Sequence, residues 1–494
     1  MGLFGAQLVF SMIMASFLQK LSQYFSLAQT VICYRLVRYM HPTDEELREA
    51  AGIPPPSSRS RGKKDARKQN GAAKDNSFTV PRNIQLKLTT AEVTDQDVVH
   101  LHFFTEYQWL VDFSSCAVIV YVITELFYWM TPHMAAGEVN LSLIWSLMAL
   151  LFILRVLWSL TAQYFRGEDG GERAMCIMFA FFCLVSAMVV LVINEDILEL
   201  GLDEAYALFS QGSNLFLATQ GLESSGPASK ISIKVILALC SALVGAFLIF
   251  PGMRLAQMYH SAQKYCADNF ILRLLLHVNF LSPLIVMLLW IKPIGREIFT
   301  QVTWGKYGIL MSSDGYESFR LWAVVAMVTL RLCLLTLHLQ AYLNLAYDRV
   351  QLMSKEAGRI SSTELQRMVA RVFYYLCVVT LHYVVPAILI LNVLFLLKTL
   401  GDGSWCSSAI CEDYSQTEHE RAPPSPFAKL PDAIGSSLKD ATEQFQVAIV
   451  TLKQVFPPLF FRGILSYALW WLCGVNFASQ VFGLTYYSYF AEQQ

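Results

Sequence analysis

Charged residues are scarce in this chain of 494 amino acids, of which 15% are charged and 55% hydrophobic. A soluble protein carries roughly 25% charged residues to keep its surface in water. The net charge of -1 also excludes nucleic-acid capture as the main activity, since that needs a clear excess of Lys and Arg. The low content of charged residues predicts an integral membrane protein whose partner is the lipid bilayer. We expect no nucleic-acid partner. Composition does not distinguish the plasma membrane from an endomembrane.

The sequence also lacks the short motifs that carry enzyme chemistry. It has no G-x-x-x-x-G-K-[ST] phosphate loop, no H-E-x-x-H zinc site, no G-x-S-x-G elbow and no C-x-x-C redox pair. The eleven cysteines lie mostly in apolar segments, where a thiol behaves as a small hydrophobe. These absences predict a protein that is not an enzyme and has no cofactor, no metal site and no catalytic residues.

Long apolar runs are abundant. A helix needs about 20 apolar residues to cross the hydrocarbon core of a bilayer. Windows of that length predict spans near residues 3–19, 108–130, 141–164, 175–194, 232–252, 270–291, 319–341, 371–397 and 463–486. The expected fold class is therefore all-α, a polytopic transmembrane helical bundle with about nine spans.

The first segment has a second interpretation. It has the length of a signal peptide, and Ser26-Leu27-Ala28 resembles a cleavage site, so cleavage would leave eight spans. Against cleavage, no basic region precedes the segment, and Lys20 falls where a cleavage region should be uncharged. We expect a retained anchor, with a cleaved signal as the alternative.

Orientation follows from the loops, because Lys and Arg near span ends mark the cytoplasmic side. Lys20, Arg35, Arg38 and the basic run Arg59–Lys68 place residues 20–106 inside. The acidic loops 195–231 and 399–446 then fall outside, and the basic segment 342–370 falls inside. The outer loop 293–318 fits poorly because it carries three basic residues, Lys292, Arg296 and Lys306.

The chain divides into five parts on this basis: an N-terminal anchor or signal segment with an interfacial helix (1–40), a partly disordered cytoplasmic linker (41–106), the main transmembrane bundle (107–398), an extracytoplasmic loop (399–446), and a C-terminal interfacial helix with the last span (447–494). Residues 54–80 are too polar to fold alone, which favours a disordered linker over a lipid-binding or phosphorylation site around Ser57–Ser60. Residues 196–220 and 442–456 predict helices that lie in the interface or pack over the bundle.

Ionisable residues within predicted spans are the candidate functional site, because a charge at membrane depth is costly and usually paired. These residues are Asp112, Glu125, Arg155, Arg273 and Arg331. All but Glu125 fall toward the cytoplasmic half, which predicts a cluster at one level, with polar lining from His277, Asn279, His338 and His382. Such a cluster suits an ion or proton pathway or a charged switch. Interhelical ion pairs, with Arg273 snorkelling to the surface, explain the same residues.

Two covalent modifications are predicted on the outer side. The sequon Asn140-Leu141-Ser142 follows the second span and is a possible N-glycosylation site, although it stands very close to that span. Cys406 and Cys411 share an outer loop, where a small disulfide is chemically permitted.

Six blocks of sequence run in order from the second expected span through the eighth: Glu106–Phe113, Glu168–Arg173, Phe250–Gln257, His338–Ala346, Lys355–Ile360 and Leu397–Gly401. In these blocks the chain resembles the transmembrane protein 161 family, while residues 1–100 match loosely and the loop 402–440 departs freely. The resemblance implies a multi-pass protein that restrains potassium and calcium currents in excitable cells and protects against oxidative stress and DNA damage. It implies no catalytic residues.

Three functions are therefore expected to compete. The first is a non-enzymatic regulator of membrane excitability or ion homeostasis, acting through other membrane proteins such as ion channels. The second is a transporter or channel that uses the intramembrane Arg, Asp and Glu residues. The third, protection against oxidative stress and DNA damage, could follow from either.

Overall fold

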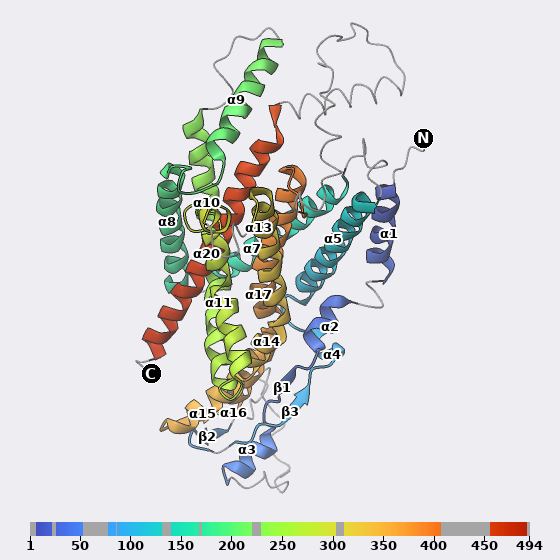
Figure 1. The fold of residues 1–494 in the computed structure, drawn as a ribbon. Helices are drawn as coiled ribbons and strands as arrows, with labels where there is room; N and C mark the ends of the chain where they lie inside the picture. Colours follow the sequence, from blue (N-terminus) through green and yellow to red (C-terminus); the bar gives the residue numbers. More distant parts are fainter. Residues whose placement is uncertain are drawn as a thin grey trace, which may run out of the picture.

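A computed structural model describes residues 6–21, 26–52, 78–84, 86–130, 140–166, 170–219, 229–302, 311–406 and 455–491. Within these residues, eight helical segments are long and apolar enough to cross a membrane: α5 (Phe104–Met130), α7 (Ser142–Arg166), α8 (Gly170–Val192), α10 (Lys230–Tyr265), α11 (Phe270–Leu288), Ser313–Lys355, Ser362–Leu400 and Pro458–Tyr489. They confirm the second through ninth predicted spans and the helical membrane fold (Figure 1).

Two of these segments consist of more than one helix. Ser313–Lys355 consists of α13 (Ser313–Cys333), α14 (Leu335–Leu343) and α15 (Leu345–Lys355), and Ser362–Leu400 consists of α16 (Ser362–Tyr374) and α17 (Leu376–Leu400). The last segment belongs to α20 (Pro458–Ala491). Pro283 lies inside α11 and Pro386 inside α17, and each helix continues through its proline.

The first predicted span, near residues 3–19, corresponds to one short helix, and a second short helix follows it. Helix α1 (Ala6–Leu21) has 16 residues and α2 (Leu27–Cys33) has 7. Phe10 of α1 contacts Phe127 near the outer end of α5, whereas the Ala28 carbonyl of α2 accepts a hydrogen bond from Tyr107 near its inner end. The two helices therefore run along α5 one after the other, and together they cover most of its length (Figure 1).

Helix α17 forms the centre of the bundle. Its apolar window is 94% buried, more than that of any other candidate span, and it packs against α5, α7, α10, α13 and α20. The long helices α10 and α20 pack against each other through small residues, since Gly252 and Gly483 lie at their contact. Gly245 of α10 likewise contacts Cys183 of α8. The small residues of α10 therefore form a face for close helix packing.

The end of the bundle that was predicted to be cytoplasmic carries two small antiparallel sheets. Strand β1 (Val37–Tyr39) pairs with β3 (Thr90–Glu92), and β2 (Thr79–Pro81) pairs with β4 (Arg359–Ser361), which lies between α15 and α16. Helices α3 (Asp44–Ala50) and α4 (Asp95–Val99) complete this layer. Residues 53–77, which contain most of the predicted disordered linker, lie outside the described residues. The pairing of β2 with β4 places two segments that were both predicted to be cytoplasmic on one side.

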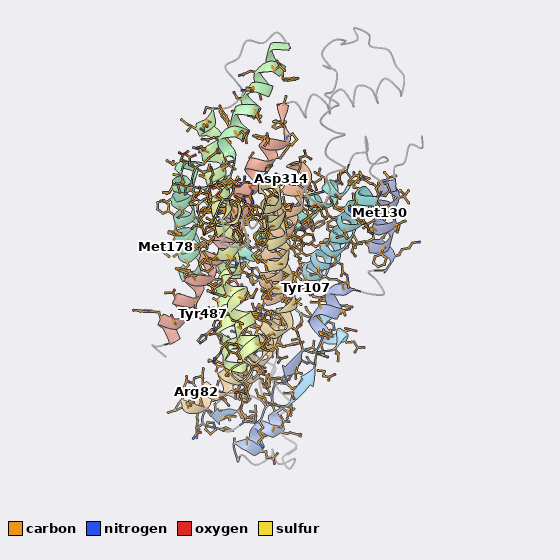
Figure 2. All side chains as sticks on the ribbon, viewed as in Figure 1. Arg82, Tyr107, Met130, Met178, Asp314 and Tyr487 are labelled. Carbon is orange, nitrogen blue, oxygen red and sulfur yellow. The ribbon has the colours of Figure 1, made fainter. Side chains whose placement is uncertain are left out.

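The opposite end carries α9 (Leu202–Thr219) and α12 (Arg296–Thr300). Helix α9 packs on α20, as expected for a helix that covers the bundle. An isolated bridge joins Leu198 to Ile291, so the loops predicted to lie outside meet each other. Arg82 and Asp314 mark the two opposite ends (Figure 2). The predicted interfacial helix at 442–456 falls almost entirely outside the described residues.

Candidate functional site: charges within the bundle

Asp112 holds the start of α2. Its carboxylate accepts hydrogen bonds from Ser26 Oγ at 2.9 Å and from the Ala28 backbone N–H at 3.1 Å. The first N–H groups of a helix have no partner within that helix, and a carboxylate at this position satisfies them and favours the helix dipole. Asp112 is 7% exposed. Because its partners are Ser26 and Ala28, it acts as an intramembrane helix cap and not as the partner of an arginine.

Glu125 forms an ion pair that the sequence analysis missed. Its Oε2 lies 2.5 Å from Nζ of Lys398, near the outer end of α17, and both side chains are mostly buried. Lys398 was not counted among the intramembrane charges because it follows the apolar run of its span. The expectation that Glu125 lies nearer the outside than the other four charges stays a prediction.

Arg331 lies in the interior of the bundle with polar but uncharged neighbours. It is 3% exposed, its Nη2 lies 3.5 Å from Asn476 Oδ1, and its guanidinium lies over the Tyr383 ring at 5.7 Å. Tyr383 donates a hydrogen bond to the Arg331 carbonyl and lies 3.4 Å from His338 Nδ1. Among the described residues no carboxylate pairs with Arg331, and its Nε makes no hydrogen bond.

The other predicted polar residues divide between this region and separate places. His338 and Asn279 are both buried. In the described part of the chain, His338 Nε2 and Asn279 Oδ1 have no hydrogen-bond partner. His277 instead exchanges a hydrogen bond with Tyr259 at 2.7 Å. His382 is 1% exposed and lies beside Tyr164, 6.0 Å between ring centroids.

Arg155 and Arg273 do not join any cluster. Both side chains are exposed on the surface of the bundle and make no ion pair with the described residues. The expectation of one cluster containing Asp112, Arg155, Arg273 and Arg331 is therefore wrong. A hydropathy window gives the depth of a residue but not the helix face on which it lies, and these four residues lie on faces that point in different directions.

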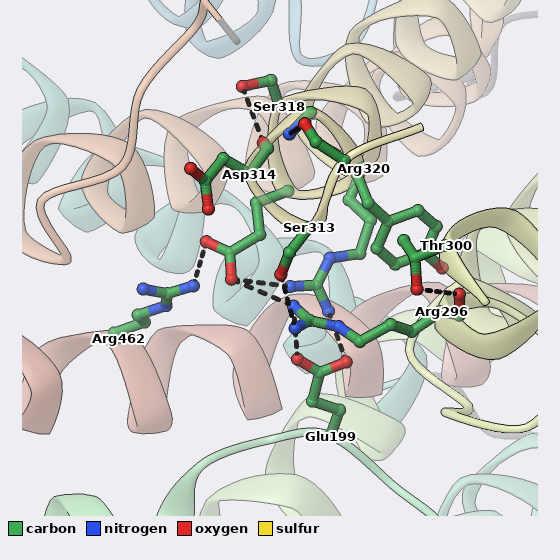
Figure 3. Close-up of polar contacts among 12 residues, drawn as sticks. Glu199, Arg296, Thr300, Ser313, Asp314, Ser318, Arg320 and Arg462 are labelled. Carbon is green, nitrogen blue, oxygen red and sulfur yellow. Dashed lines mark hydrogen bonds and ion pairs between the residues drawn. The ribbon is translucent and has the colours of Figure 1, made fainter. Parts of the chain in front are cut away.

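The largest set of ion pairs lies at the outer end, and the sequence analysis did not find it. Arg296 of α12 pairs with Glu199 at 2.8 Å and with Glu317 of α13 at 3.1 Å. Glu317 also pairs with Arg462 of α20, and Arg320 lies 3.6 Å from Glu199 (Figure 3). These five residues, which we call the outer charge network, connect the α8–α9 loop, α12, α13 and α20.

The outer charge network explains the loop that fitted the topology poorly. Arg296 is one of the basic residues in the predicted outer loop 293–318, and its charge is balanced by Glu199 and Glu317. The sequence feature that points to this network is the presence of complementary charges at the outer ends of several spans. Sequence alone did not show that these ends meet.

The two predicted modification sites are only partly described. Asn140 Oδ1 accepts hydrogen bonds from the Ser142 backbone N–H and from Ser142 Oγ, so this side chain stabilises the start of α7. Glycosylation at Asn140 stays a prediction. Cys406 is partly exposed, but Cys411 lies outside the described residues, so their disulfide also stays a prediction.

Comparison with known proteins agrees with this architecture. The family model described as predicted transmembrane protein 161AB matches residues 2–491, nearly the whole chain. No solved structure matches the chain. Eight long apolar helices and the family match identify an integral multi-pass membrane protein. The chain belongs to the family of predicted transmembrane protein 161AB.

Proposed function

We propose that this protein is a non-enzymatic regulator of membrane excitability and ion homeostasis that restrains potassium and calcium currents by binding other membrane proteins, such as ion channels. The part of this proposal that concerns potassium and calcium currents rests on the family resemblance. The observation that supports binding to a membrane partner is the position of Arg155, a charge on the lipid-facing surface.

Arg155 lies near the middle of α7. At 1.5 Å per residue it stands roughly 20 Å from Ser142 and roughly 16 Å from Arg166 along the helix axis. Leu151 and Trp158 flank it on the same face and are 67% and 64% exposed. A guanidinium in this position faces hydrocarbon, and a charge at the centre of a span costs about 2.5–3.5 kcal/mol on insertion scales.

Arg273 provides the contrast. It is also exposed, but it is in the first turn of α11, which begins at Phe270. A long side chain at a helix end reaches the polar interface by snorkelling, so Arg273 needs no partner. Arg155 is too far from either end of α7 for the same solution to be equally favourable.

The partner that fits Arg155 is a transmembrane helix of another protein with an Asp or Glu at mid-membrane depth. An ion pair there would remove both charges from lipid, and the apolar residues around Arg155 would pack against the partner helix. A two-fold contact between copies of this chain through the same face is disfavoured, because it brings two arginines together.

Current recordings in excitable cells test this proposal. Cells that lack the protein receive the wild type, Arg155→Leu or the matched control Arg273→Leu. We expect the wild type and Arg273→Leu to restore the restraint on potassium and calcium currents. Arg155→Leu should not restore it, although the variant inserts at least as well as the wild type because a lipid-facing charge has been removed.

Two outcomes would contradict the proposal. If removing the protein leaves the currents unchanged, the function in excitability is wrong. If all three variants restore the currents equally, and the same membrane proteins copurify with each, then Arg155 is not the binding site.

A transporter or channel is the second candidate, favoured by the uncompensated charge of Arg331 and its polar neighbours. Such groups line substrate or ion pathways in many membrane proteins. Flux into liposomes should then depend on Arg331 and change in Arg331→Met. The variants Arg155→Ala and Asp112→Ala are measured beside it, because they alter charged residues outside that region. Absence of flux under every ion gradient would eliminate this candidate.

Protection against oxidative stress and DNA damage is the third candidate, and it rests on the family resemblance alone. Survival of cells lacking the protein under oxidant and DNA-damaging treatment measures this role directly, and normal survival would count against it.

A further inference from the structure

A small cavity adjoins the outer charge network. It has a volume of about 40 Å³ and lies between the outer ends of α13, α17 and α20. Its charged lining consists of Arg320, Lys398, Arg462 and Glu317, and the hydroxyls of Ser404 and Ser466 also line it. Three cations and one carboxylate therefore line the same cavity, which is partly open to the surface.

Arg320 is the residue that most needs a further partner. Its side chain is 9% exposed, and its guanidinium lies over the rings of Trp290 and Tyr316 at 5.2 Å and 5.4 Å. Its Nη1 makes no hydrogen bond to the described residues: Glu199 Oε2, which also has no hydrogen-bond partner among them, lies 3.6 Å away. Its Nη2 lies 3.9 Å from Glu317 Oε1. A buried donor without a hydrogen bond costs about 1–3 kcal/mol, and more when it is charged.

The neighbouring cations keep the electrostatic potential in the cavity positive. Lys398 and Arg462 each have a carboxylate partner, Glu125 and Glu317, but Glu125 does not line the cavity. Arg donors, a lysine ammonium and serine hydroxyls are the groups that bind anions in proteins. The partly buried setting strengthens this attraction, since a low dielectric screens it less than water does.

We propose that this cavity binds a monovalent anion of the size of chloride, through Arg320, Lys398 and Arg462 with help from Ser404 and Ser466. A water molecule needs about 10–15 Å³ on the same measure, so the cavity holds one halide ion with a little water and is too small for a nucleotide or an organic phosphate. The bound anion would join α13, α17 and α20. This inference does not depend on the proposed function, because the Arg155 face belongs to α7.

Thermal unfolding of the purified full-length protein in detergent tests the site. Sodium chloride replaces sodium gluconate at constant ionic strength, and sodium bromide forms a second series. Binding to the folded state should raise the melting temperature with the logarithm of the chloride concentration, by roughly 2 °C at a concentration about tenfold above Kd. Bromide should act like chloride, whereas gluconate is too large to enter.

Two variants and one control locate the effect. Ser466→Leu fills the cavity without removing a charge, and Lys398→Gln removes one lining cation; both should lose the chloride-dependent rise. Lys230→Gln removes a cation that pairs with Asp203 at the same end without lining the cavity, so it should keep the rise.

A second measurement needs only the wild type. The NMR line of ³⁵Cl⁻ should broaden in the presence of protein and sharpen again when bromide competes. An equal melting temperature in chloride and gluconate, together with an unbroadened ³⁵Cl⁻ line, would overturn the proposal. A chloride effect that Ser466→Leu and Lys398→Gln both retain would place any binding elsewhere and also overturn it.

Discussion

Asp112 makes it possible for a helix to begin inside the membrane. The break between α1 and α2 leaves backbone N–H groups of α2 at a depth where water is scarce, and such groups cost several kcal/mol when they have no partner. The carboxylate satisfies the Ala28 N–H and the Ser26 hydroxyl together. A charge that the sequence marked as functional thus has a clear structural task.

We expect Asp112→Ala to lower the free energy of unfolding by about 1–3 kcal/mol, because it leaves buried donors without an acceptor. Asp112→Asn should cost less, since its amide oxygen can still accept one hydrogen bond. Thermal unfolding in detergent measures both. Ser115→Ala is the matched control, because Ser115 bonds only to the carbonyl of Val111 in its own helix. Equal stability of Asp112→Ala and Ser115→Ala would show that the cap contributes nothing.

Residue depth could be predicted from the sequence, but residue partners could not. Asp112, Glu125 and Arg331 were all placed within the membrane because their neighbours are apolar. Their partners are Ser26, Lys398 and Asn476, which are distant in sequence. Nothing in the local pattern shows which helix faces meet.

At the scale of elements, the contact between α10 and α20 depends on the absence of side chains. A Cβ added at Gly252 would lie 2.0 Å from Ser479 Oγ and 2.8 Å from the Ser479 backbone carbon. Close approach of this kind lets two backbones pack without intervening side chains, which is the usual basis of helix association in lipid. The glycine is therefore required despite its low helix propensity.

Gly252→Ala should destabilise the protein by about 1–3 kcal/mol, because the added methyl group must push α20 away. Gly171→Ala is the control, since no heavy atom lies within 4 Å of its added Cβ, and alanine there should be neutral or slightly stabilising. Melting temperatures of the two variants check this. A Gly252→Ala protein as stable as Gly171→Ala would mean that α10 and α20 can separate at no cost.

Helix lengths, in contrast, could be predicted well, because the thickness of the bilayer sets the length of an apolar run. Eight predicted spans have counterparts among the long helices. The exception is the segment near residues 3–19, whose helix α1 has only 16 residues and is followed by α2. Helix α1 is shorter than the roughly 20 residues that a crossing needs.

At the scale of the whole molecule, the paired strands β2 and β4 attach the segment after the linker to the bundle. Val80 and Ile360 are register partners, and both are buried, 1% and 4% exposed. Arg82 adds an ion pair with Glu356 at 2.5 Å. The sequence predicted a linker in this region, but such short strands carry too little periodicity to be recognised.

Val80→Asp should release this segment, because it places a charge in a buried position without a partner. We expect cleavage by a protease within residues 78–92 to become at least about tenfold faster, which corresponds to about 1.4 kcal/mol of local stability. Thr79→Asp changes the neighbouring exposed residue and should leave cleavage slow. Equal cleavage rates for the two variants would show that the pairing does not hold the segment.

The same pairing imposes an order on biosynthesis. Residues 79–81 are made early, and their partners at 359–361 emerge only after most of the bundle has been synthesised. At about 5–20 residues per second, strand β2 waits roughly 15–55 s for β4. During that interval its edge is unpaired and open to chaperones or to other strands. A late segment of the chain thus determines when an early segment becomes protected.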